Sequence, residues 1–108
     1  MPTGNLLLEQ STSDDGNPTL VVSGEIDLAV ATRFAQALES IVERTTGTAV
    51  VDLSQVDFID SSGIRELLHA KRNAELKHSE LVLRAPSPQC RHVLEVSGAL
   101  VEFKVRDS

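Results

Sequence analysis

The feature that most limits the fold is the alternation of short apolar runs with segments of helical periodicity along 108 residues. Apolar runs at 5–10 and 19–24 flank a polar stretch rich in Ser, Asp, Gly and Pro, a pattern typical of a β-hairpin. From residue 28, or a few residues later, to about 44, apolar side chains recur at the spacing of one helical face. We therefore expect two strands and then a helix that ends before Gly47.

The expected elements after Gly47 continue this alternation. In chain order they are a central strand at 48–53, a polar connection with Val56, Phe58 and Ile59, a helix at about 62–77, a strand at 81–84, a helix that Ser87 and Pro88 open and Gly98 ends, and a last strand in which Val101, Phe103 and Val105 point inward.

The predicted order is thus β-β-α-β-α-β-α-β, an α/β fold. Strands separated by helices become parallel neighbours through right-handed crossovers, so we expect a mixed sheet with its helices packed mainly on one face. The length fits a single domain over residues 1–108.

Composition excludes several classes of partner. The net charge of −6 disfavours binding to phosphate backbones, and without Trp or Tyr the chain offers almost nothing on which bases stack. The longest apolar run, 28–31, is far shorter than the roughly 20 residues of a membrane span. No secretion signal is visible and Cys90 has no cysteine partner. We expect a cytoplasmic protein that binds neither nucleic acid nor membrane.

The sequence also argues against metal binding and catalysis. His69, His78 and His92 form no helical i, i+4 pair, and no Cys-X-X-Cys is present, so no metal site or cofactor is expected. A hydrolase assembled from Ser62, one histidine and one aspartate would lack the Gly-X-Ser-X-Gly elbow that exposes such a nucleophile. We predict that the protein is not an enzyme and that Cys90 is a small apolar core residue.

One segment carries a dense set of polar groups: Asp57-Phe58-Ile59-Asp60-Ser61-Ser62-Gly63-Ile64. It opens the second helix, where the first four backbone N–H groups lack helical partners and favour oxygen acceptors. Gly63, having no side chain, would let a modifying enzyme approach the Ser62 hydroxyl. The alternative is that Asp60 or Ser61 only caps the helix, worth about 1 kcal/mol, and that Gly63 is incidental. The spacing alone leaves both interpretations open.

Two stretches resemble a known family: Ser23-Gly24-Glu25-Ile26-Asp27, and Val51-Asp52-Leu53 continuing through Phe58-Ile59-Asp60-Ser61-Ser62-Gly63-Ile64. They are similar to the STAS domain and, within it, to the bacterial anti-sigma factor antagonists. The resemblance covers most of the chain and implies the same order of elements. Family members commonly add a helix after the last strand, and this sequence stops at Ser108, where that helix would begin.

The resemblance implies a phosphorylation switch at Ser62, the serine just before the motif glycine. The unphosphorylated form would bind an anti-sigma factor and free its sigma factor. The anti-sigma factor, itself a serine kinase, would then phosphorylate Ser62 and end the binding, and a phosphatase would reset the switch. The further candidates for partner binding, with Asp27 beside the phosphorylation site, are Glu25, Asp27, Asp57, Asp60, Ser61 and Gly63.

A second interpretation keeps the fold and changes the role. The chain would then be a STAS module of a larger signalling assembly, or a sensor whose nucleotide or other anion contacts the amides near Ser62. Weak self-association is compatible with either role.

Overall fold

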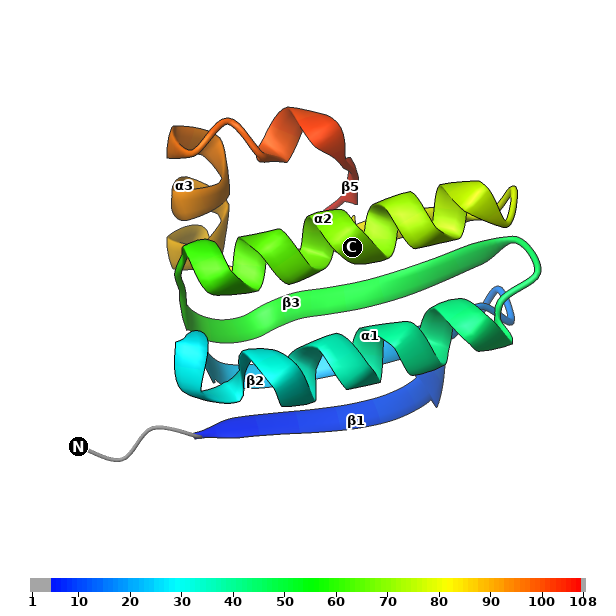
Figure 1. Ribbon diagram of the computed structural model, residues 1–108, viewed down its shortest axis with the longest axis horizontal. Helices are drawn as coiled ribbons and strands as arrows, with labels where there is room; N and C mark the ends of the chain where they lie inside the picture. Colours follow the sequence, from blue (N-terminus) through cyan, green and yellow to red (C-terminus); the bar gives the residue numbers. More distant parts are fainter. Residues whose placement is uncertain (1–4, 108) are drawn as a thin grey trace.

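The structure is a computed structural model that describes residues 5–107 (Figure 1). Its elements, in chain order, are β1 (Leu6–Thr12), β2 (Pro18–Ile26), the 3₁₀ turn η1 (Leu28–Val30), α1 (Ala31–Arg44), β3 (Thr48–Ile59), α2 (Ser61–Leu76), β4 (Glu80–Arg84), α3 (Pro88–Val96), the 3₁₀ turn η2 (Leu100–Glu102) and β5 (Lys104–Arg106).

The five strands form one mixed sheet in the order β1-β2-β3-β4-β5. The hairpin pair β1 and β2 is antiparallel, and every later pair is parallel, as strands joined through helices require. Helices α1 and α2 lie side by side over one face of the sheet, and α3 stands at one end (Figure 1). The predicted mixed α/β fold, with β3 in the centre and helices mainly on one face, is confirmed.

The core lies between the sheet and the two long helices. The predicted apolar face of α1, with Phe34, Leu38 and Ile41, is fully buried, and α1 packs on β2 and α2. Cys90 is buried as expected, and burial raises the pKa of its thiol to about 12, so it is an inert core residue. Within residues 5–107, no helix has both the length and the apolar character needed to cross a membrane.

Strand β3 is longer than the sequence predicts. The sequence predicts a polar connection in the segment that holds Val56 and Ile59, but this segment continues the strand and pairs with the second half of β2. Two register shifts interrupt this pairing, so that Leu53, Val56 and Ile59 are buried at every third position and not at every second. The expected connection is wrong because a bulged strand loses the simple alternation by which strands are recognised.

The last strand is shorter than expected. Val101 does not point inward from a strand but lies in η2 and is 87% exposed. The turn is held by the amides of Glu102 and Phe103, which donate to the carbonyls of Ala99 and Leu100. A 3₁₀ turn places Val101 on the outside, while Phe103, just after the turn, remains buried and β5 begins only at Lys104.

Ser87 determines where α3 lies. Its N–H donates to the Leu53 carbonyl at 3.1 Å, and its Oγ donates to the Val56 carbonyl and accepts from the Cys90 N–H at 3.2 Å. The predicted cap is therefore present, and it also holds α3 against the part of β3 that extends beyond the last β4 pair, Asp52 with Arg84. This places α3 beside the end of β3, where α2 begins.

Candidate functional site

The candidate site lies at the carboxyl ends of the central strands β2 and β3. These strands are parallel neighbours, and their last paired residues are Ile26 and Ile59. The Asp60 N–H donates to the Ile26 carbonyl at 3.1 Å, which brings the residue after β3 next to the residue after β2, Asp27. The topology thus brings together two of the predicted acidic residues that are 33 positions apart in the sequence.

Asp60 is the N-cap of α2, and the same oxygen binds Ser62 twice. Asp60 Oδ1 accepts from the Ser62 N–H at 2.9 Å and from the Ser62 hydroxyl at 2.5 Å. The Asp60 carbonyl accepts from the Ile64 N–H at 3.1 Å and starts the helical ladder. The Ser62 side chain is half-buried, with its hydroxyl directed to the cap. The capping interpretation therefore applies to Asp60 and not to Ser61, which is exposed at the first helical position. We call Asp60–Gly63 the α2 tip.

Gly63 does not face the solvent. It is buried, and a Cβ placed on it would lie 2.6 Å from Ile26 Cγ2 and 2.9 Å from Ile59 Cγ1. The expectation that Gly63 clears a path to the Ser62 hydroxyl is wrong, and so is the alternative that this glycine is incidental. A glycine is needed here because the first turn of α2 packs directly on the isoleucines at the two strand ends.

Substitution Gly63→Ala is expected to lower the free energy of unfolding by about 1–3 kcal/mol, because the β-branched neighbours have little freedom to withdraw. Urea unfolding monitored by circular dichroism measures this loss. Gly47→Ala is the matched control, since a Cβ there meets nothing within 4 Å. A Gly63→Ala protein as stable as wild type would show that the tip repacks freely.

The other predicted acidic residues do not all lie at the tip. Asp27 Oδ1 is buried and has no hydrogen-bond partner among residues 5–107. Glu25 is half-buried and pairs in register with Phe58. Asp57 lies away from the α2 tip, at a hollow on the sheet that it shares with Leu7 and Gln55. The structure thus brings Asp27 next to Asp60, the residue that binds Ser62, while Asp57 lines a separate surface.

Two exposed apolar residues lie close in sequence to the site residues and were not predicted from sequence. Leu28, directly after Asp27, is 78% exposed, and Phe58, two residues before Asp60, is 47% exposed. Their only sequence signal is an apolar side chain beside a polar motif, which equally fits a core residue. Exposed large apolar side chains next to a polar motif are typical of contact surfaces.

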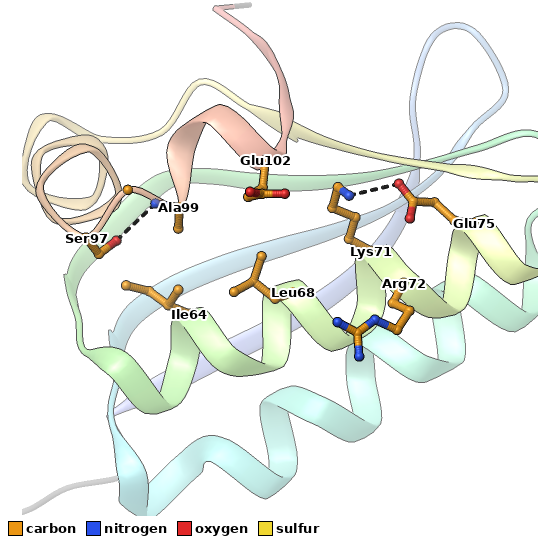
Figure 2. Close-up of a pocket in the computed structure, with 9 residues that line it drawn as sticks. Ile64, Leu68, Lys71, Arg72, Glu75, Ser97, Ala99 and Glu102 are labelled. Atoms are coloured by element: carbon orange, nitrogen blue, oxygen red, sulfur yellow. Dashed lines mark hydrogen bonds and ion pairs between the residues drawn. The ribbon is translucent and has the colours of Figure 1, made fainter.

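A hollow of about 480 Å³ lies along α2, beyond the tip (Figure 2). Ile64 and Leu68 from α2 face Ala99, and the rim carries Lys71, paired with Glu75 at 2.8 Å, together with Arg72 and Glu102. None of the predicted site residues lines this hollow. Within the described part of the chain, no three His, Cys, Asp or Glu side chains are grouped so as to hold a metal ion.

Comparison with known proteins assigns the family. Residues 10–100 match the family described as Mlab, STAS domain. The chain is 32% identical over 94 residues to BtrV of Bordetella bronchiseptica, a protein named as an anti-sigma factor antagonist on a provisional basis. The match covers 87% of this chain and 81% of BtrV.

Solved structures show the same architecture. An anti-sigma factor antagonist from Mycobacterium paratuberculosis superposes with a TM-score of 0.85 at 25% identity, covering 100% of this chain and 92% of that one. SpoIIAA has the same fold at 21% identity, with TM-scores of 0.74 for its unphosphorylated form and 0.67 for the phosphorylated Bacillus form; 92% of this chain is covered in both cases, and 87% and 90% of the SpoIIAA chains. The sequence match over most of its length and the shared fold show that the chain belongs to the STAS domain family.

Proposed function

We propose that this protein is an anti-sigma factor antagonist whose unphosphorylated form binds a serine-kinase anti-sigma factor and whose phosphorylation at Ser62 ends that binding. The relatives named as anti-sigma factor antagonists support the partner class. The existence of SpoIIAA in unphosphorylated and phosphorylated forms supports a phosphate-controlled switch on this fold. The antagonist itself catalyses no reaction, and a separate phosphatase returns it to the binding form.

The observation that carries the proposal is the position of the Ser62 hydroxyl. It lies half-buried in the first turn of α2, and exposed apolar side chains occur nearby in the chain at Leu28, directly after Asp27, and at Phe58, two residues before Asp60. A partner that binds at the carboxyl ends of β2 and β3 would meet Ser62, so a phosphate added there would enter the interface.

Incubation with candidate serine-kinase anti-sigma factors and ATP, followed by mass mapping, tests the acceptor. Transfer of the γ-phosphoryl group to Ser62 Oγ releases ADP and the hydroxyl proton. We expect one phosphate on Ser62 in the wild type and in Ser61→Ala, and none in Ser62→Ala. Phosphate on Ser61, or full phosphorylation of Ser62→Ala, would contradict the assignment of the acceptor. Absence of binding to every such anti-sigma factor would contradict the proposed function itself.

A further inference from the structure

The cap of α2 depends on the hydroxyl that the proposed switch modifies. Asp60 Oδ1 accepts from both the N–H and the Oγ–H of Ser62. Once Oγ carries a phosphate it has no proton to donate, and a group with about −1.5 to −2 charges stands next to the Asp60 carboxylate. The arrangement seen in the unphosphorylated protein is therefore incompatible with phosphoserine at position 62.

The backbone at the tip is held more firmly than the Asp60 side chain. Asp60 is held on both sides, by its N–H on the Ile26 carbonyl and by its own carbonyl, which accepts from the Ile64 N–H, each at 3.1 Å. Gly63 packs too closely on Ile26 and Ile59 for the first turn to shift inward. The Asp60 side chain, in contrast, is only half-buried and is held at the tip through its two bonds to Ser62. The side chain is the part that is free to turn away.

The amides at the start of α2 offer the phosphate a place. Among residues 5–107, the Ser62 N–H donates only to Asp60 Oδ1, and the N–H groups of Ser61 and Gly63 have no acceptor. Ser62 is the second residue of the helix, so a phosphate on its side chain reaches its own N–H and that of Gly63. Helix N-termini favour anions, and a phosphate carries more negative charge than the carboxylate it replaces.

We infer that phosphorylation of Ser62 transfers the cap of α2 from Asp60 to the phosphate and releases the Asp60 carboxylate to solvent. This inference rests on the proposed phosphorylation of Ser62 and describes how the modification changes the tip. The fold and the helix remain as they are. The partner-facing surface changes in two ways at once, because the phosphate becomes fixed on the helix axis and a second, freed carboxylate is presented beside it.

Thermal unfolding of chains with phosphoserine incorporated at position 62 during synthesis tests this transfer without any kinase. In the wild type, the phosphate replaces the Asp60 cap but must displace the Asp60 carboxylate. We therefore expect the midpoint temperature of unfolding, Tm, to change little or to fall. In Asp60→Ala, where no carboxylate caps the helix, the phosphate supplies the missing cap and should raise the midpoint by about 4–8 °C. The change in Tm caused by phosphoserine must therefore be at least about 4 °C more positive in Asp60→Ala than in the wild type.

Two comparisons keep the test decisive. Phosphoserine at the exposed Ser61 is the matched control and should show a smaller dependence on Asp60, because Ser61 has no side-chain bond to it among residues 5–107. Should Asp60→Ala fail to fold, Asp60→Asn serves instead, since Asn keeps a neutral cap and removes the repulsion. A phosphoserine-62 effect equal in both backgrounds would overturn the inference, whatever the outcome of the kinase experiments.

Nuclear magnetic resonance gives a second, independent measurement. If the phosphate holds the helix amides, the amide proton shifts of Ser62 and Gly63 in the phosphorylated wild type will titrate with the second phosphate ionisation, near a pKa of about 6. Amide shifts that do not respond to that ionisation would show that Asp60 remains the cap and would overturn the inference.

Discussion

Phosphorylation of Ser62 is expected to weaken binding of the anti-sigma factor about a thousandfold, which corresponds to about 4 kcal/mol. The loss arises at the interface, because burying a phosphate without a compensating cation costs several kcal/mol. The fold itself should change little, since helix N-termini accept anions. Isothermal titration of the phosphorylated and unphosphorylated chains against the same partner measures the two dissociation constants.

Substitutions separate charge from position. Ser62→Ala should bind like the wild type and remain bound in the presence of ATP, while Ser62→Glu, with a single charge, should bind at least about tenfold more weakly. Ser61→Glu places the same charge one residue earlier, on an exposed side chain, and should have a smaller effect. Equal binding by Ser62→Glu and wild type would refute the electrostatic switch. A larger loss of affinity in Ser61→Glu than in Ser62→Glu would indicate that Ser61 is the residue whose charge controls binding.

Gly24→Ala is expected to cost more stability than any other glycine substitution considered. Gly24 has φ +100°, and a Cβ there would lie 2.0 Å from the Asn5 carbonyl oxygen and 3.1 Å from its carbon. Both obstacles are backbone atoms of the residue just before β1, and the Glu25 N–H donates to that same Asn5 oxygen at 3.0 Å. The substitution must therefore part β1 from β2. A loss of about 3–5 kcal/mol is expected.

Gly16→Ala is the matched control for Gly24→Ala. Gly16 also has positive φ, +86°, but a Cβ there meets nothing within 4 Å. Its substitution carries only the conformational cost of a side chain in the left-handed region, about 1–2 kcal/mol. Denaturant unfolding of both variants isolates the steric contribution. If the two variants lose equal stability, β1 is not held as closely to Gly24 as the structure shows.

Much of the fold could be predicted because each helix or strand has a local signature. The apolar spacing of α1, the turn residues of the hairpin and the Ser87-Pro88 start of α3 depend only on neighbouring residues. The end of β3 could not be predicted, since its burial pattern follows register shifts against β2, a strand about 30 residues away. The outward position of Val101 likewise depends on a 3₁₀ turn, and an apolar side chain at that position gives no sign of such a turn.

The candidate site divides in the same way. Sequence alone placed Asp60, Ser61 and Ser62 at a helix start, because capping chemistry is local. It did not distinguish which residue is the cap, and it assigned the wrong role to Gly63, because that role is set by Ile26 and Ile59 on two strands. The exposure of Leu28 and Phe58 is also a property of the assembled sheet.

The amino-acid sequence by itself determined the order of helices and strands, their amphipathic faces and the serine-rich start of α2, since these follow from interactions over a few residues. Only the tertiary structure decided which glycines are sterically required, which acidic residues meet and which apolar side chains stay exposed. Those properties depend on distances between segments far apart in the chain, and such distances exist only once β2 and β3 lie side by side.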